Sequence, residues 1–106
     1  LIEALPEQKR QERAKMVKIY DQIIKIETRT EFIYHEAEIQ KFITDANERI
    51  HANGIPSEHS LVLGQTITQK FTIKLPRIPI GLGIAMCIQH TGLKVRYDYP
   101  NLQLFH

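Results

Sequence analysis

The fold of this chain is decided by residues 6–53, PEQKRQERAKMVKIYDQIIKIETRTEFIYHEAEIQKFITDANERIHAN, which hold no Gly or Pro after Pro6. The apolar residues in this stretch recur at steps of three and four, a spacing that places them on one face of an α-helix. Pro6 suits the first turn of such a helix, and Asn53-Gly54 suits its end. The spacing predicts one helix of about 45 residues. Its apolar members are Met16, Ile19, Ile23, Ile26, Ile33, Ala37, Ile39, Ile43, Ala46 and Ile50.

A seven-residue repeat runs through the first part of this helix. Met16 and Ile23 take its a positions, Thr30 and Ala37 continue them, and three isoleucines take its d positions. Such a repeat is typical of coiled-coil packing, and it shifts phase after about three heptads. An apolar stripe of this length marks an interaction surface, so we expect a homodimer or another homo-oligomer, either parallel or antiparallel. The expected interface residues are Met16, Ile19, Ile23, Ile26, Thr30, Ile33 and Ala37.

A second interpretation divides the same stretch into two helices. Thr28-Arg29-Thr30-Glu31 matches the capping box, in which a hydroxyl side chain is followed three residues later by Glu. It could begin a second helix and produce a helical hairpin. One continuous helix is favoured because a hairpin turn usually contains Gly, Asn or Pro, and none of these lies near Thr28.

The period of the apolar pattern changes in residues 54–106. Polar and apolar side chains alternate over residues 70–75 and again over 93–99, which predicts half-buried strands. Residues 80–88 are apolar, and a short helix is expected from Pro79 to about His90. Residues 102–105 predict a last short strand. Prolines at the end of the first strand are expected to terminate it.

These patterns predict an α+β fold, in which a long coiled-coil-like N-terminal helix precedes a small antiparallel sheet with one short helix. Residues 1–53 form the helical segment and residues 54–106 the small module. About 50 residues rarely bury enough surface to be stable alone. We therefore expect the second region to pack against the helix, a second copy or another protein.

The charge distribution leaves nucleic acid as an alternative partner. The net charge is only +2, but the second region carries five Lys and Arg residues against two acidic ones. A basic face of the C-terminal sheet could bind nucleic acid through Lys70, Lys74, Arg77, Lys94 and Arg96. Alternation places Tyr97 and Tyr99 on the face opposite Lys94 and Arg96, which favours tyrosines that pack in the core over tyrosines that stack on bases.

No pattern in the chain predicts catalysis, a metal or a cofactor. Gly81-Leu82-Gly83 resembles part of a dinucleotide-binding fingerprint, but Met86 stands where the third glycine belongs, so close helix packing is favoured. Glu48-x-x-His51 has the spacing found in di-metal bundles, yet such sites need ligands from several helices. We therefore expect a non-enzymatic oligomerisation or assembly module, a structural subunit of a larger complex.

Two further groups of residues fit this non-catalytic interpretation. Ser57, His59 and Ser60 are neighbours in a loop rich in turn-forming residues, and a catalytic triad is formed in space, so we expect no nucleophile there. Cys87 has apolar neighbours and is expected to be a small core residue.

Composition says little about location. A single Cys and the absence of a signal peptide weakly favour an intracellular setting, and no apolar run is long enough to span a bilayer. Because the first residue is Leu1, we expect the sequence to be part of a longer protein.

Overall fold

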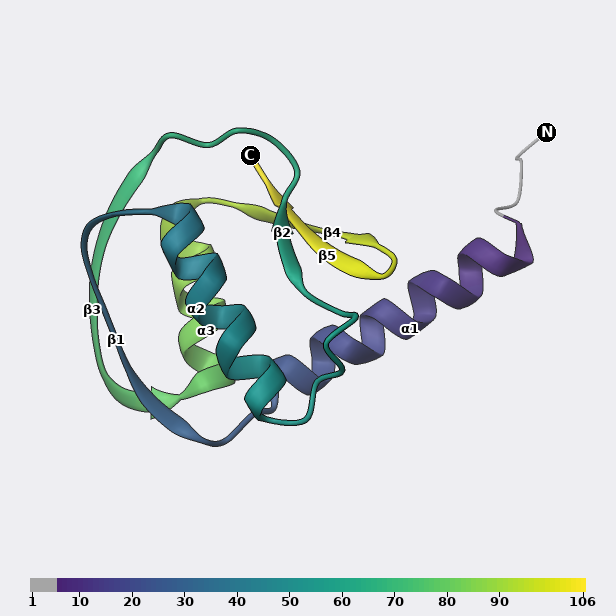
Figure 1. The fold of residues 1–106 in the computed structure, drawn as a ribbon, viewed down its shortest axis with the longest axis horizontal. Helices are drawn as coiled ribbons and strands as arrows, with labels where there is room; N and C mark the ends of the chain where they lie inside the picture. The colour runs from purple at the N-terminus through teal and green to yellow at the C-terminus, as the bar shows by residue number, and fades with distance from the viewer. Residues whose placement is uncertain (1–5) are drawn as a thin grey trace.

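The computed structural model describes residues 6–106 and confirms the α+β class, with three helices and two small sheets in that part of the chain (Figure 1). In chain order the elements are α1 (Glu7–Ile24), β1 (Arg29–Glu38), α2 (Ile39–Ala52), β2 (Leu61–Leu63), β3 (Lys70–Pro79), α3 (Ile80–Thr91), β4 (Lys94–Asp98) and β5 (Asn101–Phe105).

The prediction of one long helix is wrong, because α1 has 18 residues and ends at Ile24. The strand β1 separates it from α2, so the helical hairpin is wrong as well. Residues 29–38 include Phe32, Ile33 and Tyr34, which are aromatic or β-branched and favour strands. Phe32 is fully buried and Tyr34 is buried, whereas Ile33 between them is 56% exposed. Burial in this stretch therefore has a period of two. The helical interpretation was misled because it counted Ile33, which is exposed, among the buried residues.

The strands β1 and β3 form a two-stranded antiparallel ribbon, which curves around α2 and α3 (Figure 1). Its inner face carries Phe32 opposite Leu75 and Tyr34 opposite Ile73. The register shifts at two places along β1. At the second shift, Glu36 has a φ of 46°, and its N–H donates to the Thr72 hydroxyl at 2.9 Å.

Proline does not end β3 where the sequence pattern suggested. Pro76 lies inside β3, which continues to Pro79. A proline is tolerated here because β3 pairs with β1 alone and leaves its other edge unpaired. The sheet register skips Pro76, since Leu75 pairs with Phe32 and Ile78 pairs with Thr30.

The remaining strands form a separate sheet in the order β2-β5-β4. The central strand β5 runs parallel to β2 and antiparallel to β4. The single C-terminal sheet predicted from the sequence is therefore wrong, because β3 pairs with β1 and not with β4 or β5.

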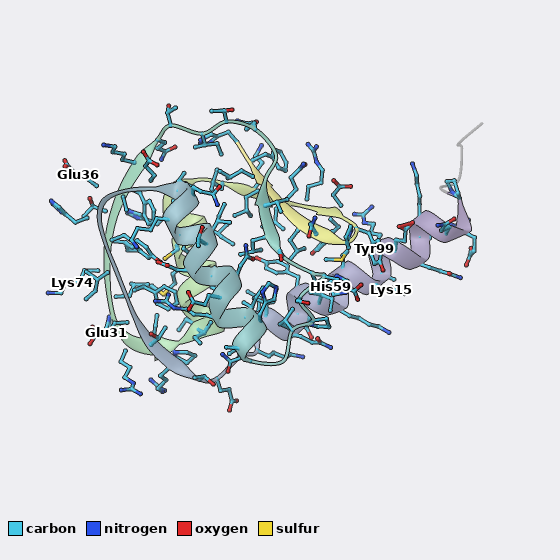
Figure 2. The ribbon with its side chains drawn as sticks, viewed as in Figure 1. Lys15, Glu31, Glu36, His59, Lys74 and Tyr99 are labelled. Atoms are coloured by element: carbon cyan, nitrogen blue, oxygen red, sulfur yellow. The ribbon has the colours of Figure 1, made fainter. Side chains whose placement is uncertain are left out.

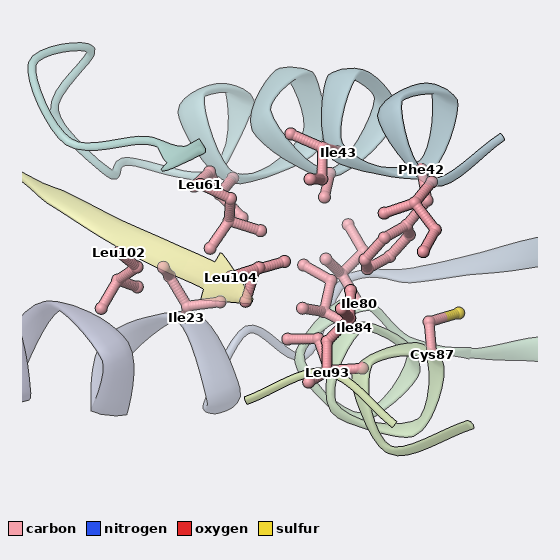
Figure 3. Close-up of a cluster of buried hydrophobic side chains, with 14 of the residues drawn as sticks. Ile23, Phe42, Ile43, Leu61, Ile80, Ile84, Cys87, Leu93, Leu102 and Leu104 are labelled. Atoms are coloured by element: carbon pink, nitrogen blue, oxygen red, sulfur yellow. The ribbon is translucent and has the colours of Figure 1, made fainter. Parts of the chain in front are cut away.

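One apolar core joins the two halves of the chain. Figure 3 shows Ile23 of α1 and Phe42 of α2 in the same cluster as Ile84 of α3 and Leu104 of β5. Two glycines let α3 approach its neighbours closely. A Cβ at Gly81 would overlap the Ile24 carbonyl group, and one at Gly83 would overlap the Phe32 ring. The Gly-x-Gly pattern thus serves helix packing, as the sequence analysis favoured.

Candidate binding surfaces

The seven residues expected at an oligomer interface do not share one helical face. Met16, Ile23 and Ile26 are buried in the core of this chain, and Ile19 packs against that core. The other three, Thr30, Ile33 and Ala37, belong to the strand β1. The continuous helical stripe is therefore wrong, because the chain covers the first part itself and the rest is not helical. Contact between copies through these residues stays a prediction.

The helix α1 divides into a packed half and a projecting half. Near its C-terminus, Ile23 is buried, and the Tyr20 ring meets the Tyr97 ring of β4 edge-on at 6.3 Å between centroids. Residues 7–15, which we call the projecting half, extend beyond the rest of the molecule (Figure 1), and all of them except Glu12 are exposed. The molecule is consequently elongated, with extents of 48 × 29 × 20 Å.

An apolar stripe on α1 faces solvent. Ala14, Val17 and Ile24 lie three and seven residues apart and are exposed. Val17 and Ile24 directly follow the buried Met16 and Ile23, so they lie about 100° around the helix from its buried side. Val17 is 45% exposed and Ile24 is 37% exposed. We call these three residues the exposed stripe.

A groove of about 550 Å³ runs between the projecting half of α1 and the strand β4. Lys9, Glu12 and Arg13 form its helical wall. Its other wall contains Arg96, whose guanidinium carbon lies 4.3 Å from the centroid of the Phe105 ring. The remaining lining residues are Val95, Tyr97, Asp98, Tyr99 and Phe105.

The end of the β4–β5 hairpin beside this groove is held by buried polar contacts. Figure 2 shows His59, Tyr99 and Lys15 close together. His59 Nδ1 lies 2.7 Å from the Pro100 carbonyl oxygen, to which it donates, and its ring meets Tyr99 at 5.9 Å between centroids. The Lys15 ammonium lies 5.8 Å from the centre of the Tyr99 ring. These contacts fix one end of the groove relative to α1.

His59 and Ser60 of the 57–60 loop make structural contacts with His51 of α2. His51 Nε2 donates to the His59 carbonyl oxygen at 2.7 Å and lies 3.3 Å from the Ser60 hydroxyl. No group of three His, Cys, Asp or Glu side chains in residues 6–106 is arranged to hold a metal ion. Glu48 is exposed, whereas His51 is turned to the His59 carbonyl oxygen and the Ser60 hydroxyl.

The five basic residues proposed for nucleic acid do not form one face. Lys70, Lys74 and Arg77 lie on β3, in the ribbon, whereas Lys94 and Arg96 lie on β4, in the other sheet. Figure 2 places Lys74 on the opposite side of the molecule from Lys15 and Tyr99. Of these five residues, Arg96 alone lines the groove. The sequence did not predict the groove, because no local pattern links α1 to β4.

Two groups with shifted pKa values lie in the core. Burial raises the pKa of the Cys87 thiol from 9.0 to about 11, although the nearby Arg49 acts in the opposite direction. Burial also raises the pKa of Tyr34, helped by the hydrogen bond that its hydroxyl donates to the Asp45 carboxylate at 2.8 Å. Both side chains are therefore neutral at pH 7, and neither faces the groove.

Comparisons with protein-family models, with curated proteins and with solved structures gave no match. Within residues 6–106, no helix is long and apolar enough to cross a membrane. The surfaces of the molecule are therefore the basis for its proposed function.

Proposed function

We propose that this protein is a non-enzymatic assembly module, in which two copies pair through the exposed stripe of α1. The observation that supports the proposal is the exposed stripe itself, in which Val17 is 45% exposed and Ile24 is 37% exposed. Helical segments this short are marginal in water without a packing partner. Burying an aliphatic side chain fully contributes roughly 1.5–3 kcal/mol, so covering this stripe stabilises the helix.

Charge favours an antiparallel arrangement of the two helices, which the sequence left open. A pair centred on Val17 places Arg13, one turn before the centre, beside the partner's Asp21, one turn after it. The twofold axis repeats this contact, as in an isologous interface. Asp21 already pairs with Lys25 at 2.8 Å, and this pair is exposed, so Asp21 remains accessible to a second cation. A parallel pair in register would instead place Arg13 beside the partner's Arg13.

The test is light scattering after size exclusion, applied to the wild type and to Val17→Asp. We expect the wild type to elute at twice the 12.4 kDa chain mass and Val17→Asp to elute as a monomer, since a carboxylate at the centre of an apolar contact must be desolvated. Val17 is the informative position because it is exposed, whereas Ile23 is buried and its replacement would unfold the chain.

The matched control is Ile33→Asp, the same change at an exposed residue of β1. This variant should remain dimeric. A monomeric wild type at micromolar concentration would contradict pairing altogether, and a dimeric Val17→Asp would place the interface elsewhere. The antiparallel register has its own test. Arg13→Asp should weaken the pair, and adding Asp21→Arg to it should restore the pair.

A further inference from the structure

The strand β4 has an unpaired edge whose backbone groups can be identified. It is the outer strand of its sheet. In the central strand β5, the Leu102 N–H donates to the Ser60 carbonyl and the Leu104 carbonyl accepts from the Gly64 N–H, both at 2.9 Å. The main-chain groups of Leu102 and Leu104 therefore face β2 and not β4.

This orientation decides which groups of β4 are open. Tyr97 lies opposite Leu102, and Val95 lies opposite Leu104. Hydrogen-bonded and non-hydrogen-bonded pairs alternate along an antiparallel ladder. Because Leu102 and Leu104 point toward β2, these two pairs are the non-hydrogen-bonded ones. The N–H and C=O groups of Val95 and Tyr97 consequently point outward, away from β5.

The residues that carry the outward groups line the groove. Val95 and Tyr97 line it on one side, and Lys9 and Arg13 of α1 line it on the other. Its volume of about 550 Å³ lies within the range of sites that take a ligand. The groove thus combines an open strand edge with a helix that stands beside it.

The β4 edge lacks two of the features that prevent strand addition, proline and a bulge, although Lys94, Arg96 and Asp98 give it charge. Edge strands are commonly protected by proline, bulges or charges. The ribbon has a proline and bulges, with Pro76 in β3 and two register shifts along β1. By contrast, the register of β4 with β5 is continuous from Lys94 to Asp98, and β4 contains no proline.

From this geometry we propose that an extended acidic segment of a partner protein adds to β4 as a further strand. Its main chain hydrogen-bonds to Val95 and Tyr97, which is the mode of recognition called β-augmentation. Its side chains alternate between two faces, so carboxylates on it can meet Lys9, Arg13 and Arg96. These three cations outnumber Glu12 and Asp98, the acidic residues of the groove.

The first experiment uses a fluorescein-labelled heptapeptide of alternating Glu and Val, with fluorescence anisotropy as the readout. We expect a Kd of about 10–100 µM. The same peptide, N-methylated at alternate backbone nitrogens, cannot form the ladder and should bind at least about tenfold more weakly. Equal binding of the two peptides, or no binding of the first at about 1 mM, would overturn the proposal.

Matched variants of the protein test the groove itself. Lys9→Glu combined with Arg96→Glu should weaken binding about tenfold. The control carries the same charge change on the ribbon, away from β4, as Lys70→Glu combined with Lys74→Glu, and should stay within about twofold of the wild type. Equal losses in the two double variants would show that net charge and not the groove attracts the peptide, which contradicts the proposal.

A backbone variant gives a second test. Val95→Pro removes one outward N–H without removing a bond to β5, and proline is accepted on edge strands. It should weaken peptide binding by about fivefold or more while the Tm stays near that of the wild type. If Val95→Pro does not fold, the N-methylated peptide tests the same hydrogen bonds from the ligand side.

Two further measurements separate this proposal from other uses of the surface. Salt-sensitive binding of a labelled oligothymidylate, without binding of the acidic peptide, would make the groove a nucleic-acid surface and overturn the proposal. Peptide binding should also persist in Val17→Asp, because none of the three residues of the exposed stripe lines this groove. Loss of binding in that variant would show that the site requires the paired form, which contradicts the assignment to one chain.

Discussion

At the scale of single residues, the chain places its titratable core groups where water does not reach them. Cys87 is fully buried, and its pKa is raised to about 11 because burial penalises the thiolate. A buried thiol of this kind acts as a small apolar side chain. Because the pKa of Cys87 is higher in the folded chain than its ordinary value, the free energy of unfolding depends on pH.

We predict that the free energy of unfolding falls as the pH rises from about 9 through 11. The folded-state pKa of Cys87 lies above its ordinary value of 9.0, so its contribution is fully present below pH 9 and is lost as the pH passes 11. Urea denaturation at several pH values measures the decline. Tyr20 and Tyr34 also have raised pKa values, so the thiol contribution is isolated by comparison with Cys87→Ala. An identical decline in that variant would contradict a role for the thiol.

Gly81 is a second residue whose role is settled by its surroundings. We predict that Gly81→Ala lowers the free energy of unfolding by about 1–3 kcal/mol, because its Cβ would overlap the Ile24 backbone and force α3 away from α1. Alanine ordinarily gains up to about 1 kcal/mol over glycine in a helix. A net loss in chemical denaturation would therefore identify the packing effect.

The control for this substitution is Gly64→Ala. The atoms that its Cβ would meet belong to the Gln103 side chain, which can move aside. Its effect should stay within about 0.5 kcal/mol. A stabilised Gly81→Ala would mean that α1 and α3 are not in close contact.

At the scale of elements, β1 is the segment that gives the molecule its shape. It pairs with β3 along ten residues and supplies Phe32 and Tyr34 to the core. The Phe32 ring lies beneath the Arg49 guanidinium of α2, whose central carbon is 4.7 Å from the ring centroid. Tyr34 and Phe71 bring their rings within 5.0 Å on the inner face of the ribbon.

Adjacent substitutions in β1 distinguish a strand from a helix. We predict that Phe32→Ala costs about 3–5 kcal/mol, since it removes a fully buried aromatic ring. Ile33→Ala should change stability by no more than about 0.5 kcal/mol, because that side chain is exposed on the outer face. Urea denaturation compares the two. A larger loss at Ile33 than at Phe32 would contradict the register of β1.

At the scale of the whole molecule, two surfaces remain for partners, and both involve α1. The exposed stripe lies on one side of the helix, and the groove lies beside β4. The contact between Lys15 and Tyr99 connects α1 to the β4–β5 hairpin. The two surfaces meet at Arg13, which lines the groove and also takes part in the proposed antiparallel contact. Val17→Asp and the double substitution at Lys9 and Arg96 test the two surfaces separately.

The sequence alone determined those features that depend on nearby residues. Its α+β class, the strands from Lys70 and around Val95, the helix that follows Pro79 and the packing role of the glycine pair in α3 all follow from local period and chain geometry. The apolar side of α1 was also correctly recognised as helical up to Ile24.

The tertiary structure decided what covers each apolar surface. Spacing along a chain cannot show whether Met16 and Ile23 face a second copy or the chain's own core, because the hydrophobic effect is not directional. Residues 29–38 fitted a helical period through Ile33 and Ala37, and only the pairing with β3 made Phe32 and Tyr34 the buried residues. The groove, likewise, exists because α1 and β4 meet across more than 80 residues of sequence. No local pattern encodes that meeting, since it results from the burial of the whole core.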